Sequence, residues 1–382
     1  MLIISSIARA DLVEPLKLFR RFEVWHLYRT LEADTSPARL DSRTIAFRNL
    51  FDLLLKIGRI KPSLIQGSEP YDFPHGFWLC CVTFLAAGIL RTPYYFPTLE
   101  NVPPESKFRE RRGIRVGRLL VPLLRNFMRI YARKALLIFA INNGSMKNLL
   151  SVGAPRGRIH RELYGTWGVD LDLFSPQMVD STAGHEERRE VLFIGRIIRA
   201  KGIPELLEAF LRVKQQIPAA KLSLVGDGPM VSDVRTFARE NGLREAITLH
   251  GLVPNHDLPP LIIGADVLVS PSIATPTWAE QVGMVNIQSM ACGTPVVSTN
   301  SGAIAEFVED GQTGILVKEC DPESLAQAIV RVITDKELHH RLSVNARACA
   351  VKRYDAKRNV NSVERVLIDG LTAIADRGRL NR

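Results

Sequence analysis

The sequence predicts an α/β protein made of two doubly wound domains, and three observations lead to this prediction. The chain has 382 residues, which is more than a single hydrophobic core usually supports. Hydrophobic residues make up 46% of it and charged residues 24%, as in folded globular proteins. In the second half, short apolar runs alternate with segments of helical pattern, which is typical of a parallel sheet covered by helices on both faces.

The alternation is most regular after residue 190. Strands are expected over Val191–Ile194 and Lys221–Val225, each followed by a helix, over Pro204–Gln216 and Met230–Asn241. A strand over Ile247–His250 completes a βαβαβ unit. Later apolar runs extend the same sheet: Val267–Val269, Val296–Ser298 and Gly314–Val317.

The first half repeats this theme less regularly. Its strand candidates are Leu2–Ser6, Val24–Tyr28, Ser63–Gln66, Tyr94–Pro97 and Leu136–Ile141. The most apolar run, residues 76–90, is shorter than the roughly 20 residues that cross a bilayer, which predicts a buried core helix. Residues 173–189 have the Pro-, Ser- and Asp-rich composition of a linker. We expect an N-terminal domain over residues 1–175 and a C-terminal domain over 176–359, with helix 360–382 packing back on the first.

The cysteines and the N-terminus indicate a cytoplasmic protein. The five cysteines are scattered and form no C-x-x-C pair, so neither a disulfide framework nor a zinc site is expected. The first residues lack the basic segment and the cleavage site of a signal peptide. We expect no metal and no other cofactor.

Basic charge is concentrated in the first half of the chain. Residues 1–180 hold 26 Lys and Arg against 16 Asp and Glu, and the remaining residues hold 24 of each. This asymmetry indicates an anionic partner, and no nucleic-acid-binding motif accompanies it, which favours an acidic membrane surface. Four arginines share one face of a predicted helix: Arg118, Arg125, Arg129 and Arg133. Such a helix suits the inner face of the plasma membrane, and an ordinary surface helix fits the pattern equally well.

Two strand ends that contain glycine are candidates for phosphate binding. In VLFIGRIIRAKG, Gly195 ends a strand, and Arg196 and Lys201 lie in the loop before the next helix, where two cations can neutralise a diphosphate. Taken alone, a basic loop of this kind is more often only solvated. In SLVGDGPM, Gly226 follows the next strand, but the third glycine of a dinucleotide fingerprint is missing, so a tight turn is the better interpretation.

A third segment carries the most chemistry. Glu280 precedes a turn, and Gly283, Met284 and Val285 begin a helix whose free N–H groups and positive dipole end suit a phosphate. We expect Glu280 to lie at an exposed loop tip, where it accepts hydrogen bonds from sugar hydroxyls. Gln288 lies about one helical turn further along, where its amide is expected to reach a ribose.

These three segments, in this order and spacing, resemble glycosyltransferase family 4, a large family of GT-B fold that uses UDP- or GDP-sugars. FIGRIIRAKGIPELLEAF resembles the family's phosphate-binding Arg and Lys, and LVGDGP its next strand and turn. HGLVPNHDLP, which contains Leu252, resembles its base-proximal loop, and WGVDLDLFSP the stretch after its N-terminal domain. The match is strong over residues 191–317 and loose in the N-terminal half.

The resemblance implies two Rossmann-like domains facing a central cleft. It further implies a retaining glycosyltransferase that moves a sugar from a UDP- or GDP-sugar to a glycan or lipid-linked acceptor, as in the synthesis of cell-envelope polysaccharide, without a metal. Arg196, Lys201 and the amides at the helix start would hold the diphosphate as charge builds on it. Glu280 and, from the N-terminal domain, Glu100 are the carboxylate candidates for catalysis.

Two departures from the family pattern leave alternatives open. The second glutamate of the family's E-x7-E motif, which usually holds the ribose hydroxyls, is Gln288 here. The Gly-rich loop after the first strand is missing, and Glu100 and Asn101 stand in place of the N-terminal histidine, with His75 as the nearby alternative. A catalytically degenerate binding subunit and a GT-B epimerase or phosphorylase are therefore alternative functions.

Overall fold

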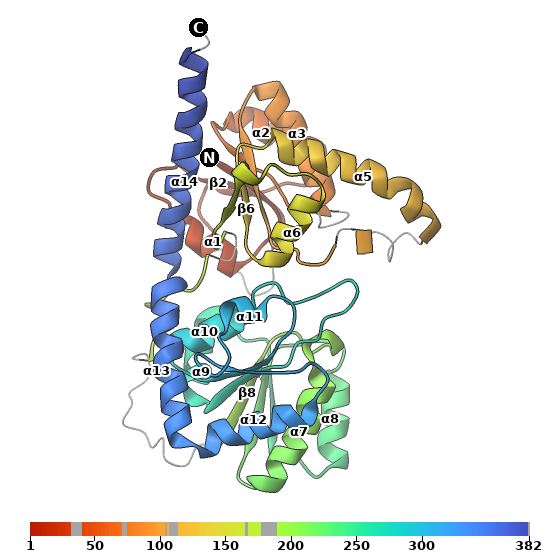
Figure 1. Cartoon of the computed structure of the whole chain (residues 1–382), viewed down its shortest axis with the longest axis vertical. Coiled ribbons are helices and arrows are strands. Elements are labelled where there is room, and N and C mark those ends of the chain that lie inside the picture. The colour runs from red at the N-terminus through yellow and green to blue at the C-terminus, as the bar shows by residue number, and fades with distance from the viewer. Residues whose placement is uncertain are drawn as a thin grey trace. The chain divides into compact units, whose positions relative to one another are not determined.

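The computed structural model describes residues 1–31, 40–70, 75–103, 105–106, 114–164, 167–176 and 189–380 of the chain. It contains two compact units (Figure 1). The first comprises Met1–Trp167 together with Ala356–Arg382, and the second comprises Gly168–Asp355. Both boundaries lie a few residues before the predicted ones. The reason is a pairing within the second unit, where the N–H of Val169 donates to the carbonyl of Tyr354 at 2.7 Å.

The second unit is built on a six-stranded sheet with the order β10-β9-β8-β11-β12-β13. Every neighbouring pair is parallel. The strands are β8 Glu190–Ile194, β9 Lys221–Val225, β10 Ile247–Gly251, β11 Val267–Ser270, β12 Val296–Thr299 and β13 Ile315–Val317. The chain order reverses between β8 and β11, and in sheets of this order ligands bind beyond the carboxyl ends of the strands at that switch point. The predicted doubly wound sheet is confirmed.

Helices cover both faces of this sheet. The helical segments are η4 Arg199–Lys201, α7 Ile203–Gln216, α8 Val231–Glu240, η5 Asn255–Asp257, α9 Leu258–Gly264, α10 Met284–Cys292, α11 Ile304–Phe307, α12 Pro322–Thr334 and α13 Lys336–Arg353. In Figure 1, α7, α8 and α12 lie on one side of the strands, and α9 and α10 lie on the other. Apolar residues at helical spacing, such as Leu206, Phe210 and Val213, are fully buried in the core.

The first unit has a seven-stranded parallel sheet with the order β3-β2-β1-β4-β5-β6-β7. The strands are β1 Leu2–Ala8, β2 Trp25–Leu31, β3 Thr44–Ala46, β4 Ile65–Gln66, β5 Tyr94–Thr98, β6 Ile138–Ala140 and β7 Ile159–Arg161. All five strands predicted for this half form. The two edge strands, β3 and β7, were not predicted, because each has three residues and none of them is fully buried, so the sequence has no apolar run there.

The helical segments of the first unit are α1 Ala10–Leu16, α2 Leu50–Ile60, α3 His75–Leu90, α5 Ile114–Lys134, α6 Asn143–Ser151, η2 Arg156–Arg158 and α14 Ala356–Leu380. The predicted core helix at residues 76–90 is α3, which buries one face only. Its other face exposes Trp78 by 52% and Ile89 by 70%. Within the described ranges, no helix combines the length and the apolar composition that a membrane span requires.

Candidate active site

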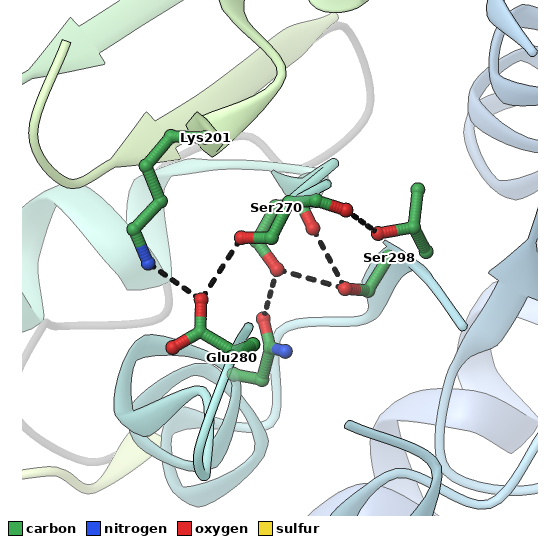
Figure 2. Close-up of polar contacts among 7 residues, drawn as sticks. Lys201, Ser270, Glu280 and Ser298 are labelled. Atoms are coloured by element: carbon green, nitrogen blue, oxygen red, sulfur yellow. Dashed lines mark hydrogen bonds and ion pairs between the residues drawn. The ribbon is translucent and has the colours of Figure 1, made fainter. Parts of the chain in front are cut away.

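Lys201 and Glu280, two of the predicted site residues, lie on the loops that follow β8 and β11, at the switch point of the sheet (Figure 2). The Nζ atom of Lys201 lies 2.5 Å from Oε2 of Glu280. The same carboxylate oxygen accepts the hydroxyl of Ser272, the second residue after β11, at 2.9 Å. The indole of Trp278 lies 5.2 Å from the Lys201 ammonium, a distance typical of a cation–π contact. Lys201 and Glu280 are thus held together by contacts within the protein.

The prediction that Glu280 lies at an exposed loop tip is wrong. Its side chain is only 14% exposed, and that of Lys201 is 19% exposed. The loop after β11 folds back on the protein, because the carbonyl of Glu280 accepts the N–H of Ala303 at 2.9 Å. The N–H of Ile273 likewise donates to the carbonyl of Ala200 at 2.9 Å, which ties this loop to the one that carries Lys201.

A second polar cluster lies beneath this pair and is also drawn in Figure 2. The hydroxyl of Ser270 donates to Oδ1 of Asn286 at 2.7 Å, and that of Ser298 donates to the carbonyl of Ser270 at 2.7 Å. All three residues are buried. These bonds join β11, β12 and α10 and so fix the start of α10 against the sheet. The sequence carried a signal for this cluster, since two otherwise apolar strand segments each include a serine near the carboxyl end.

Gly202 marks a close approach between the two loops of the site. Its φ is +71°, and a Cβ at this position would lie 1.9 Å from the carbonyl oxygen of Pro271. Gly202→Ala should therefore lower the free energy of unfolding by about 2 to 4 kcal/mol, measured by urea denaturation. Gly242, at φ +67° with open space around it, provides the control. Gly242→Ala should cost about 1 kcal/mol, and equal losses in the two variants would show that contact with Pro271 is unimportant.

The start of α10 has the geometry expected for phosphate binding. Gly283 caps the helix with a φ of 73°, and a Cβ there would lie 2.9 Å from Nδ2 of Asn286. Among the described residues, no backbone carbonyl accepts the N–H groups of Met284 and Val285. These two amides stand at the positive end of the helix dipole and suit an anion.

The side chain of Gln288 forms a hydrogen bond within the protein. Its side chain is buried, with 8% exposed, and its Nε2 donates to Oδ1 of Asn255 at 2.8 Å. Asn255 belongs to the loop that resembles the family's base-proximal loop, in which Leu252 is 69% exposed. Gln288 therefore links α10 to this loop, and its contact with a ribose stays a prediction.

Two further predicted residues lie at the same edge of the sheet. Gly226 follows β9, and a Cβ there would lie 2.0 Å from the carbonyl oxygen of Gly195, so the strand ends pack backbone against backbone. The tight turn at Gly226 stays a prediction. Arg196 is exposed directly after β8. Its contact with a diphosphate stays a prediction.

In the first unit, Glu100 lies two residues beyond β5 and is 3% exposed. Its Oε1 accepts the N–H of Val102 at 3.1 Å. Glu69, which follows β4, accepts the hydroxyl of Thr98 and the N–H groups of Leu99 at 3.1 Å and Glu100 at 2.8 Å. Burial and then the negative charge of Glu100 raise the pKa of Glu69 to about 7. Glu69 was not among the predicted site residues, although it lies only three residues beyond β4. The catalytic role of Glu100 stays a prediction.

Residues 176–348 match the family model of glycosyl transferases group 1. The match covers most of the second unit and somewhat less than half of the chain. A putative glycosyltransferase, YtcC of Bacillus subtilis, is 34% identical over 199 residues, which are 47% of this chain and 47% of that protein. A GDP-mannose-dependent alpha-(1-6)-phosphatidylinositol monomannoside mannosyltransferase of Mycolicibacterium smegmatis is 26% identical over 250 residues, 63% of this chain and 64% of that protein. The chain spans about half the length of several of the curated relatives it matches.

Solved structures match nearly the whole chain. Anabaena Alr3699/HepE, in complex with UDP and glucose, has a TM-score of 0.76 at 20% identity and covers 96% of this chain and 99% of its own. The sucrose-phosphate synthase of Thermosynechococcus elongatus has a TM-score of 0.70 at 20% identity and covers 97% and 99%. At this identity the likeness concerns the fold alone, and it confirms the predicted GT-B fold.

Proposed function

We propose that the chain is a retaining glycosyltransferase, which moves a sugar from a UDP- or GDP-sugar to a glycan or lipid-linked acceptor. The observation that carries the proposal is the Lys201–Glu280 pair at the switch point, next to the start of α10. An ammonium group has three N–H donors, and Glu280 accepts only one of them. The others are available to phosphate oxygens without breaking the pair.

The proposed chemistry follows from where charge develops. As the bond between sugar and diphosphate breaks, negative charge grows on the leaving phosphate, where Lys201, Arg196 and the N–H groups of Met284 and Val285 stabilise it. Because Lys201 and the start of α10 are already fixed by the contacts described above, they need little rearrangement at the moment of reaction. Glu280 keeps Lys201 in place and, through its carboxylate, is proposed to accept hydrogen bonds from the sugar. We further propose that the anomeric configuration is retained.

The test is donor binding and donor turnover. Saturation-transfer NMR with UDP-, GDP- and ADP-sugars should show contacts to both the base and the sugar of one donor. Release of the nucleoside diphosphate in the presence of acceptor should follow, and NMR of the product should show the anomeric configuration of the donor. Binding without any turnover would favour the degenerate binding subunit, and inverted product would reject retention.

We also propose that α5 attaches the protein to an anionic membrane surface, through a face that shares only Arg133 with the predicted one. Arg125 donates to the carbonyl of Ser151 at 2.6 Å and also pairs with Glu105, and Arg129 donates to the carbonyl of Val152 at 3.2 Å. These two arginines therefore bind the protein, and the side chain of Arg118 lies outside the described part. Three exposed apolar residues at helical spacing, followed by two exposed cations, support the proposal: Leu120, Leu123, Ile130, Arg133 and Lys134.

The triple substitution Leu120→Ser, Leu123→Ser and Ile130→Ser should remove most of the binding to the membrane surface. We expect the parent protein to co-sediment with vesicles that contain anionic lipid and to be released as salt rises, because salt screens the cations. The triple variant should sediment roughly tenfold less, since it loses the apolar contact with the bilayer. A matched triple serine variant replaces exposed apolar residues elsewhere, at Val344, Val351 and Ile374. Equal sedimentation of the two variants, or equal binding to neutral vesicles, would reject the proposal.

A further inference from the structure

A cavity of about 340 Å³ opens in the first unit, beside the carboxyl-terminal parts of β1 and β2 and the residues that follow β3. This volume is at the lower end of the range of small-molecule sites. None of its lining residues takes part in the donor site described above, which lies in the other unit. The residues that matter for its chemistry are Ser6, Arg29, Arg48, Asn49, His75 and Trp78.

The polar wall of this cavity carries positive charge and several hydrogen-bond donors. Nη1 of Arg29 donates to Nδ1 of His75 at 3.3 Å. A guanidinium can only donate, so Nδ1 is the acceptor and the remaining ring nitrogen, Nε2, carries the proton as a second donor. Both Arg29 and Arg48 are exposed, and no described lining residue carries a carboxylate.

The acid beside the cavity does not cancel this charge. Asp52 accepts the backbone N–H of Arg48 at 2.9 Å and pairs with Lys56 at 2.7 Å. These contacts, with Lys56 the largest, hold the pKa of Asp52 below its usual range, so it is ionised and matched by the lysine. Among the described residues, the two arginines that line the cavity therefore remain as an excess of positive charge.

The other wall is apolar and partly open to solvent. Trp78, in the first turn of α3, is 52% exposed, and Leu50, the first residue of α2, is 38% exposed. Both line the cavity. A large aromatic ring left in water at the rim of a charged cavity offers a flat surface to a sugar ring or to a hydrocarbon chain.

We propose that this cavity binds the phosphate group of an acceptor that is a phosphate or diphosphate ester. Arg29, Arg48 and Nε2 of His75 contact the phosphate oxygens, and the organic part of the acceptor lies on Trp78 and Leu50. Guanidinium groups suit phosphate because their parallel N–H groups match two oxygens at once. This assignment rests on the proposed function. It narrows the acceptor of that function from any glycan or lipid-linked molecule to one that carries a phosphate. Two sources share this chemistry, a polyprenyl diphosphate carrier and a soluble sugar phosphate.

Calorimetric titration of the full chain tests the assignment with three probes. Farnesyl diphosphate represents the lipid carrier, glucose 1-phosphate represents the soluble source, and farnesol is the uncharged analogue of the first. At least one of the two phosphates should bind, and farnesol should bind at least tenfold more weakly than farnesyl diphosphate. A preference for farnesyl diphosphate identifies the lipid source, and a preference for glucose 1-phosphate identifies the soluble one.

Two double variants of equal charge separate the cavity from bulk electrostatics. Arg29→Gln with Arg48→Gln should weaken phosphate binding by roughly tenfold or more. Arg59→Gln with Arg156→Gln, at exposed positions outside the cavity, should leave it unchanged. Trp78→Ala should weaken binding of the preferred ester but not that of inorganic pyrophosphate.

The outcomes that overturn the assignment differ from those that overturn the proposed function. UDP and GDP are titrated into the same samples. If one of them binds while neither phosphate probe does, or if the two double variants behave alike, the acceptor assignment is wrong and the donor site stands. If neither nucleotide binds the parent protein, the proposed function is wrong as well.

Discussion

Replacing Glu280 with alanine should lower kcat/KM for sugar transfer by about a thousandfold while the protein stays folded. The change removes the carboxylate that accepts from both Lys201 and Ser272, at 2.5 and 2.9 Å. It takes away the proposed sugar contact and frees Lys201 to leave its position. The free energy of unfolding should fall by about 3 kcal/mol, because the variant leaves Lys201, whose side chain is only 19% exposed, without its ion-pair partner. Steady-state kinetics and urea denaturation measure the two effects.

Two companion variants make this experiment decisive. Glu280→Gln keeps the shape and an acceptor oxygen but loses the charge, so it should recover part of the activity only if hydrogen bonding to the sugar matters more than the ion pair. Glu245→Ala removes an exposed carboxylate elsewhere in the second unit and should leave transfer unchanged. If Glu280→Ala retained more than about half of the parent activity, Glu280 would be excluded from the site.

Lys201→Ala should weaken the binding of the nucleoside diphosphate by about 1.5 to 3 kcal/mol, the size of a charge-assisted hydrogen bond. The loss should lie at the upper end, because the variant also leaves the carboxylate of Glu280 without its lysine partner next to an anionic ligand. For Arg196→Ala, the loss of binding free energy should lie at the lower end of the same range, since Arg196 is exposed and solvent screens its charge. Calorimetric titration with UDP and GDP measures both.

The matched control for these cations is Lys221→Ala. Lys221 is exposed at the first residue of β9, so it lies at the opposite, amino-terminal edge of the same sheet. The Lys221→Ala variant should bind nucleotide as tightly as the parent protein does. Equal affinity in Lys201→Ala, Arg196→Ala and the parent would reject the phosphate site.

The fold of the second unit was predictable because its central strands, β8, β11 and β12, are buried on both faces. Such strands appear in the sequence as unbroken apolar runs, and each predicted run from Val191 to Val317 overlaps a strand of the sheet. The edge strands β3 and β7 lack this signal, since none of their side chains is fully buried. Their pairing depends on neighbouring strands that are distant in the sequence.

The site was predictable only in part. Strand ends at the switch point indicated that Lys201 and Glu280 would lie at one edge of the sheet, and the structure brings them into contact. Their burial was not predictable, because it depends on how the loop after β11 folds back, where the carbonyl of Glu280 accepts the N–H of Ala303. The hydrogen bond from Gln288 to Asn255 was not predicted for a similar reason, since 33 residues separate the two partners in the chain.

The chain leaves the first unit at Trp167 and returns to it at Ala356. The returning helix, α14, buries Val360, Val363 and Leu367 in a core that also contains Trp167. A ribosome therefore completes the contiguous second unit before the first unit has all of its parts. The apolar surface that α14 covers in the first unit therefore stays uncovered until α14 has been synthesised, so the first unit completes its core after the second.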